Sequence, residues 1–308
     1  MGSVQFKYNH DITSLPVAIV RGAEHGPQVY IGAATHGDEI NGVEVCRRLI
    51  NNLDPMHVNG SIVIVPVQNP LGFLSRQRNN PVDGLENDSI YPGRSDGSLT
   101  ERIAYFLYST YASKCEYVID IHTATTGGRN LPHVYVPFSN HDSSLIDSLE
   151  LAIAFQPDLI IRVEPGIDYG FDLTHLSPFV AARDDRRGIY IEIGEGNRLE
   201  RSYVERGYQG LVNVLARIGC LKSSDRAAKR NSRVVTRVSY VKSPAMGLLN
   251  VTTSLGADVR RGDRVAEIIE PLGPSKVCTA PTEGFVFRVQ TYGLTKLNDN
   301  IVTIGHNP

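Results

Sequence analysis

The chain has 308 residues, of which 41% are hydrophobic and 21% are charged, the composition of an ordinary globular protein. Its net charge of −2 gives no electrostatic basis for binding nucleic acid or an anionic membrane, and no segment has the apolar length of a membrane span. We therefore expect no nucleic-acid partner and no membrane partner. The length suits one large domain followed by a small one.

The cysteines indicate a reducing compartment. Cys46, Cys115, Cys220 and Cys278 are widely spaced and include no CxxC pair. The N-terminal residues lack the charged and apolar regions of a signal peptide. These two features predict reduced thiols in a cytoplasmic protein.

The first functional signal lies in a turn between a buried strand and a helix. After an expected edge strand at residues 16–20, residues 29–34 form an apolar run that predicts a strand buried on both faces, and residues 43–50 show helical spacing. His36 and Glu39 stand three residues apart on the intervening turn. An imidazole and a carboxylate at this spacing can reach one point, as two of the three ligands of a catalytic zinc must. The same pair also fits an ordinary hydrogen-bonded turn.

Two further strands end in side chains that could complete this site. Residues 117–122 are apolar and end in His122, and residues 188–194 carry Glu192 near their end. Ligands of an open α/β sheet bind beyond the carboxyl ends of its strands, so we expect both side chains beside His36. Two histidines, a glutamate and a further carboxylate are the components of a hydrolytic zinc site.

The rest of the first 222 residues predicts alternating strands and helices. The stretch 68–100 lacks periodicity and follows a strand end, so we expect it to wall the active site, and residues 164–187 are also irregular. The alternation predicts an α/β fold with a mostly parallel sheet and helices on both faces. Strands are expected at 61–67, 134–136 and 159–163, and helices at 100–108, at 143–155 with Asp142 as the cap, and at 199–218.

The pattern changes after residue 222. Residues 223–233 are polar and basic without an apolar face, which predicts a linker. We therefore expect a catalytic α/β domain over 1–222 and a small all-β C-terminal domain over 234–308. The short strands expected in the second domain are 234–241, 247–251, 265–269, 284–289 and 301–304.

Taken together and in this order, the motifs resemble the succinylglutamate desuccinylase/aspartoacylase family, which is related to the zinc carboxypeptidases. The resemblance spans nearly the whole chain. It implies one zinc ion per chain held by His36, Glu39 and His122, with Glu192 as the general base and Arg78 polarising the scissile carbonyl. The implied reaction is hydrolysis of the amide bond of a small N-acylated amine or amino acid, in a cleft walled by the C-terminal domain. The matching stretches are 36–42, 69–70, 78–93, 120–122 and 192–194.

The substrate-binding loop departs from the family at two positions. The family's Asn and Arg, which hold the substrate carboxylate, fall on Asp88 and Ser89. Because a carboxylate repels another carboxylate, we expect N-acetylaspartate and succinylglutamate to be poor substrates. The expected substrate offers an amine, a hydroxyl or a neutral group to Asp88. Arg129, in the loop after His122, could restore an anion contact or could face water.

Three carboxylates near the expected site need separate interpretations. Residues 192 and 194 share one face of a strand while Glu195 points away, which favours Glu192 as the base. Asp38 and Asp120 could accept hydrogen bonds from metal-bound imidazoles, as carboxylates around metal sites often do.

Two other functions stay open besides deacylation. A carboxypeptidase-like metallopeptidase would use the same metal site, and tests of short peptides against N-acyl compounds would separate the two. A non-catalytic binding protein could keep the fold, although retention of the ligands, the base and Arg78 argues against it. A biotinyl- or lipoyl-type carrier is rejected, since Gly273 stands where the modified lysine would be. The acyl group cannot be read from the sequence, which also leaves a homo-oligomer open.

Overall fold

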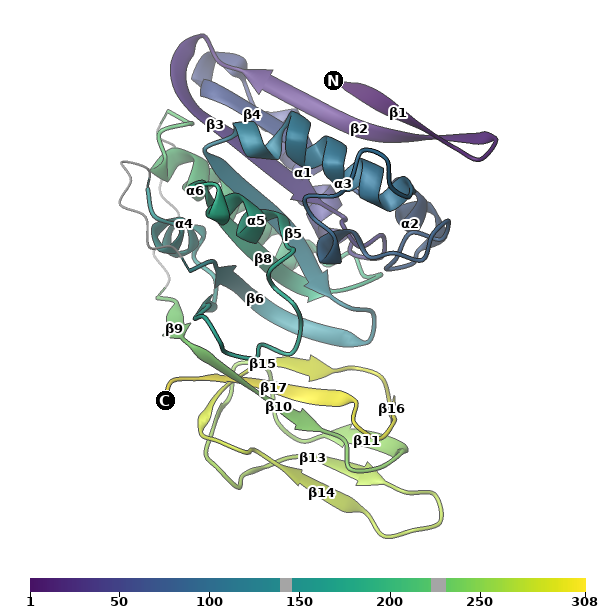
Figure 1. Ribbon diagram of the computed structural model, residues 1–308. Coiled ribbons are helices and arrows are strands. Elements are labelled where there is room, and N and C mark those ends of the chain that lie inside the picture. The colour runs from purple at the N-terminus through teal and green to yellow at the C-terminus, as the bar shows by residue number, and fades with distance from the viewer. Residues whose placement is uncertain (139–145, 223–230) are drawn as a thin grey trace.

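A mixed sheet with a parallel centre runs through the molecule and carries the site (Figure 1). The computed structural model describes residues 1–138, 146–222 and 231–308. In order across the sheet, the strands are β1 (Gly2–Tyr8), β2 (Asp11–Arg21), β4 (Asn59–Val65), β3 (Glu24–Ala33), β5 (Tyr117–Ala124), β8 (Arg187–Glu195), β6 (Gly128–Val136), β15 (Gly284–Gln290), β17 (Asn300–His306) and β10 (Arg237–Lys242). Three short strands complete it: β7 (Leu159–Arg162) pairs with β6, β9 (Arg233–Val235) pairs with β7, and β12 (Asp258–Val259) pairs with β15.

The central strands β4, β3, β5 and β8 are parallel, and their apolar residues pack against helices on both faces. In β3, Val29 and Ile31 belong to the core on one face, and Tyr30 belongs to the core on the other. This coverage explains why these strands are continuous apolar runs, and it confirms the expected fold class. On the first face lie α1 (Asn41–Asn52), α4 (Ser148–Phe155) and α6 (Arg201–Arg217), and on the second lie α3 (Leu99–Thr110) and α5 (Ser177–Arg183).

The C-terminal residues form a second, four-stranded antiparallel sheet and also extend the first one. The extension is made where β15 pairs antiparallel with β6, with Arg288 opposite Asn130. Figure 1 shows these strands, in green and yellow, at the end of the molecule farthest from β1. The pairing matters because it brings residues of β15 and β17 next to β6 and β8. The second sheet has the order β14 (Lys276–Thr279), β13 (Arg264–Ile269), β11 (Gly247–Val251) and β16 (Leu294–Thr295).

Two expectations about local structure are wrong. The strand expected at the edge, residues 16–20, is part of β2 and lies inside the sheet, because residues 2–8 form an outer strand against it. Pro16 fits this position because pairing with β4 begins only at Ala18. The irregular stretch 164–187 contains α5, a seven-residue helix too short to show clear periodicity.

Two expectations touch residues outside the described part of the chain. The helix expected at 143–155 begins at Ser148, where Asp147 caps it by accepting a hydrogen bond from the Leu149 amide. Asp142, the cap predicted from the sequence, and most of the expected linker at 223–233 lie outside the described residues. The division of the chain at this linker stays our proposed domain boundary.

Candidate active site

The turn after β3 is held in place by its backbone. The amide of Gly37 donates to the carbonyl of Arg78 (3.2 Å), and a Cβ atom at position 37 would lie 1.9 Å from the backbone of Gly72 in α2 (Pro70–Ser75). The turn therefore packs directly against α2, at a position that only glycine can fill. This packing fixes the neighbouring residues His36 and Glu39 at the carboxyl end of β3.

Three buried side chains meet at this sheet edge. His36 Nδ1 lies 2.8 Å from Glu39 Oε1, His122 Nδ1 lies 2.9 Å from Glu39 Oε2, and the two Nδ1 atoms are 3.3 Å apart. Ligands about 2.0–2.1 Å from a tetrahedral zinc ion are about 3.3 Å from one another, so this spacing fits a shared metal ion. The Thr123 amide donates to Glu39 Oε2 (3.0 Å) and orients the carboxylate. The donor set and its geometry therefore fit a zinc site.

The charges of this cluster also suit a cation. Although burial opposes ionisation of Glu39, the neighbouring His36 and His122 hold the pKa of its carboxyl group well below the usual range. Burial likewise opposes protonation of the imidazoles, but Asp120 and Glu39 raise the pKa of His122 to about 10. The surrounding carboxylates thus favour positive charge at this point, which a metal ion would supply in place of protons.

The outer nitrogens of both imidazoles face further carboxylates. His36 Nε2 lies 3.1 Å from Glu86 Oε1 and 3.0 Å from Asp88 Oδ2, and His122 Nε2 lies 3.5 Å from Asp120 Oδ1. Such contacts orient metal-binding imidazoles. Asp38, the other candidate for this role, accepts a hydrogen bond from Thr126 instead.

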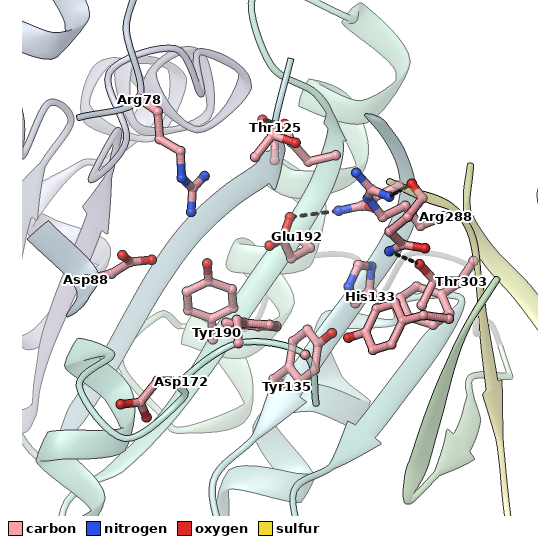
Figure 2. Close-up of a pocket in the computed structure, with 18 of the residues that line it drawn as sticks. Arg78, Asp88, Thr125, His133, Tyr135, Asp172, Tyr190, Glu192, Arg288 and Thr303 are labelled. Carbon is pink, nitrogen blue, oxygen red and sulfur yellow. Dashed lines mark hydrogen bonds between the residues drawn. The ribbon is translucent and has the colours of Figure 1, made fainter. Parts of the chain in front are cut away.

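Glu192 lies beside the cluster and faces the cavity that adjoins it (Figure 2). Asn130 donates to its Oε2 at 2.8 Å. Burial and the nearby Glu39 raise the pKa of Glu192 to about 8. The Glu195 side chain does not line this cavity. Its Oε1 accepts a hydrogen bond from Thr291 (2.8 Å), and its Oε2 lies 3.3 Å from Arg198 Nε.

The cavity has a volume of about 460 Å³ and is walled by both parts of the chain. Figure 2 shows Arg78 and Asp88 on one side, and His133, Arg288 and Thr303 on the other. On the first side, Arg78 donates to Glu39 (3.0 Å) and to Glu86 (2.6 Å). Residues from both β15 and β17 contribute to the second side, as the resemblance to the family implies. The lining contributed by these two strands is Phe287, Arg288, Asn300 and Thr303.

Of the three candidate substrate-binding residues, the structure places two at the cavity and one away from it. Asp88 and Ser89 line the cavity, whereas Arg129 does not and instead forms an ion pair with Glu200 at the start of α6. The cation that sequence reasoning missed is Arg288. Its position in a largely apolar strand gave no sign of a functional role, because only the pairing of β15 with β6 brings it to the cavity.

Comparisons with known proteins identify the family of the chain. Residues 25–218 match the succinylglutamate desuccinylase/aspartoacylase catalytic domain. The N-alpha-acetyl-L-2,4-diaminobutyric acid deacetylase of Halomonas elongata is 27% identical over 266 residues, which cover 83% of this chain and 74% of the relative.

Solved structures show the same fold. The product-bound ectoine utilization protein EutE (DoeB) of Ruegeria pomeroyi superposes with a TM-score of 0.88 at 23% identity, over 99% of this chain and 94% of that one. A succinylglutamate desuccinylase/aspartoacylase from Rhodobacter sphaeroides gives a TM-score of 0.86 at 22% identity, with the same coverage. The chain thus belongs to the succinylglutamate desuccinylase/aspartoacylase family, a family of deacylases that act on N-acyl amino compounds.

Proposed function

We propose that this protein is a zinc-dependent hydrolase that cleaves the amide bond of a small N-acylated amine or amino acid. The observation that carries the proposal is the convergence of His36, Glu39 and His122 next to a buried glutamate in a cavity. Membership of a deacylase family supports the same reaction. A cavity of about 460 Å³ suits a small molecule. The deacetylase relative favours a deacylase over the carboxypeptidase-like alternative.

The proposed chemistry divides among the residues of the cavity. A zinc ion held by His36, Glu39 and His122 would supply a water of lowered pKa and an electrophile for the amide carbonyl. Glu192 takes the proton of the attacking water and passes it to the leaving nitrogen. Its raised pKa suits both steps, because a base near neutrality can accept a proton and return it. Asn130 holds the Glu192 carboxylate in position.

Arg78 is proposed to bind the carbonyl oxygen as negative charge develops on it. The guanidinium is kept in the cavity wall by Glu39 and Glu86, which leaves it beside the cluster. Removal of one donor of this kind typically costs about 3 kcal/mol of transition-state stabilisation.

The substrate class follows from the loop that carries Asp88. Asp88 is buried, lines the cavity and lies 3.0 Å from His36 Nε2. A carboxylate at this place favours a cationic or hydrogen-bond-donating substrate group. The relative from Halomonas elongata, whose name gives an acetylated diamino acid as its substrate, suggests the same kind of compound. We therefore propose N-acylated compounds with a free amine as the first substrates to test.

Two further observations concern the cysteines and the described helices. All four cysteines are buried and unpaired, which supports the proposal that the enzyme works in a reducing cytoplasm. None of the described helices is long and apolar enough to cross a membrane.

The test is a hydrolysis assay with zinc-loaded and chelator-treated protein on N-acetyl-2,4-diaminobutyric acid, N-acetylaspartate and short peptides. We expect amide cleavage of the first compound that chelation abolishes and added zinc restores. Faster cleavage of the peptides would support the peptidase instead. Binding of the N-acetyl compounds without turnover by the zinc-loaded protein would support a non-catalytic binding protein.

A further inference from the structure

Arg288 is the cation that the C-terminal strands bring to the cavity. It lies on β15 opposite Asn130 of β6, the residue that holds Glu192. Its guanidinium occupies space next to Gly128, where a Cβ atom would come within 2.5 Å of Nη2. Figure 2 shows the side chain at the edge of the cavity, close to Glu192 and His133.

Among the residues that the structure describes, no carboxylate forms an ion pair with Arg288. The hydrogen bond that its guanidinium makes to the described residues runs from Nη1 to the carbonyl of Asn300, at 3.2 Å. The other cavity arginine, Arg78, is bound by two carboxylates. A half-buried guanidinium stays charged and is costly to desolvate unless an anion pairs with it.

The surroundings of Arg288 are aromatic and carry little compensating charge. Tyr135, Tyr240 and Phe287 line the same part of the cavity. His133 lies there too, and burial lowers its pKa to about 4, so the ring is neutral at pH 7. Glu192 is a carboxylate whose charge acts on Arg288, and it is already held by Asn130. The guanidinium is therefore available to an anionic group of a bound molecule.

The charges of the cavity are separated. Asp88 and Asp172 lie on the side opposite Arg288 in Figure 2. Ser89, where the resemblance to the family implies an arginine, also lines the cavity. A substrate anion would be repelled by Asp88, and the arginine on that side, Arg78, is already bound by Glu39 and Glu86. Among the described residues that line the cavity, the arginine without an ion-pair partner is Arg288, on the other side. A substrate amine would be attracted by Asp88 and repelled by Arg288.

We propose that Arg288 binds the carboxylate of the substrate and replaces the arginine that the family carries at the position of Ser89. The substrate class is then an N-acylated diamino acid, with its carboxylate on Arg288 and its free amine toward Asp88. This inference rests on the proposed deacylase function for the position of the cleaved amide. It assigns to the C-terminal strands the recognition of charge, in addition to closing the cavity.

The experiment compares N-acetyl-2,4-diaminobutyric acid with its primary carboxamide, which has no anion, in the zinc-loaded full-length protein. We expect Arg288→Met to lower kcat/KM by about 10- to 100-fold for the acid, mainly through KM, and to leave the carboxamide within about 3-fold. Arg288→Lys should recover part of the loss, because lysine keeps the charge but not the planar fork. Arg264→Met is the matched control, since Arg264 is an exposed cation of the same β region, paired with Glu267.

Equal losses for the acid and the carboxamide in Arg288→Met would overturn the proposal, because they would point to an effect on Glu192 or on folding. So would a selective loss in Arg129→Met with none in Arg288→Met, which would place the anion site at Arg129. Calorimetric titration with 2,4-diaminobutyric acid and its carboxamide separates this inference from the proposed function. If turnover is absent but Arg288→Met still abolishes the preference for the acid, the deacylase proposal fails and the anion site stands. If both compounds bind the unmodified protein equally while turnover occurs, the anion site is wrong and the deacylase stands.

Discussion

The two walls of the cavity differ in how their charged groups are paired. In the wall formed by the ends of β3, β5 and β8 and the loop before α3, charged groups contact one another, as Arg78 does with Glu39 and Glu86. In the wall formed by β15 and β17, the cation Arg288 has aromatic neighbours and no ion-pair partner among the described residues. The first wall holds its groups in place before any substrate arrives, which suits chemistry. The second leaves a charge to be satisfied by a ligand, which suits selection.

This comparison makes the two walls separable by mutation. Changes in the first wall should lower turnover of every substrate. Changes in the second wall, or at Asp88 and Ser89 in the loop that faces it, should alter the order of substrates by kcat/KM. The following variants test that division.

The largest effect is expected from loss of a metal ligand. His36→Ala and His122→Ala each remove a donor from the cluster, so zinc content should fall from one ion per chain to well below that, with activity reduced about 1,000-fold or more. Elemental analysis and the hydrolysis assay measure both. Asp38→Asn is the control, because Asp38 is also buried nearby but bonds to Thr126. Stoichiometric zinc in both histidine variants would remove the metal site from this wall.

The next effect tests the base in the same wall. Glu192→Gln keeps the size and polarity of the side chain but cannot take a proton, so we expect retained zinc and a loss in kcat of about 100-fold or more for all substrates. Glu195→Gln is the matched control, since Glu195 bonds to Thr291 outside the cavity. If the control variant is the one that loses activity, the assignment of the base is wrong.

Most residues of the first wall could be predicted from the sequence, because each of them is marked by the short stretch of sequence around it. His36, Glu39, His122 and Glu192 each follow or end a continuous apolar strand, and parallel strands bring such ends to one edge. The structure brings these four together, while their roles stay proposals. The central strands and the long helices were predicted for the same reason, since their apolar patterns extend over many residues.

The second wall was not readable because it depends on pairing between distant strands. Nothing in residues 284–290 shows that β15 joins β6, so Arg288 looks like an ordinary polar residue near the end of an apolar strand. The sequence offered Arg129 as a candidate anion contact, with a water-facing position as the alternative; it is close to His122 in sequence but pairs with Glu200. Short elements such as α5, β12 and β16 were missed because they contain too few residues for a periodic signal.

A smaller effect is expected from restoring the family residues in the loop. The double variant Asp88→Asn/Ser89→Arg changes the local charge by two units, and one charge contact at about 4 Å and an effective dielectric near 20 is worth about 4 kcal/mol before desolvation. Even a quarter of that changes a ratio of rates about fivefold. We expect the kcat/KM ratio of N-acetylaspartate to N-acetyl-2,4-diaminobutyric acid to rise by at least that factor. Efficient hydrolysis of N-acetylaspartate by the unmodified protein, with no change in Asp88→Asn, would show that the loop charge does not set selectivity.

The smallest effect is one of stability, at the place where the two walls meet. His133 lies on β6 and packs edge-on against Phe287 of β15, with ring centroids 4.7 Å apart. Its Nδ1–H donates to the carbonyl of Leu131 at 2.8 Å, and burial lowers its pKa to about 4. The unfolded chain, with an ordinary histidine pKa of about 6.5, therefore binds a proton between pH 6.5 and 4 that the folded protein does not. His133 contributes stability that is fully present above pH 6.5 and is lost as the pH falls toward 4, with a slope of up to about 1.4 kcal/mol per pH unit.

His133→Gln should remove this part of the acid sensitivity, because glutamine does not titrate and can still donate to the Leu131 carbonyl. Urea unfolding from pH 7.5 to 4.5 gives the slope of the free energy of unfolding against pH for each protein. The difference between the two slopes is compared, because titration of the groups that both proteins share cancels in it. The variant is expected to be less stable at pH 7.5, where packing against Phe287 is lost, and to close part of that gap as the pH falls. His57→Gln, which removes an exposed histidine, is the matched control. Parallel pH profiles for the unmodified protein and His133→Gln would mean that the folded protein accepts a charged imidazole at position 133. A neutral His133 would then not be part of what keeps Arg288 free for an anion.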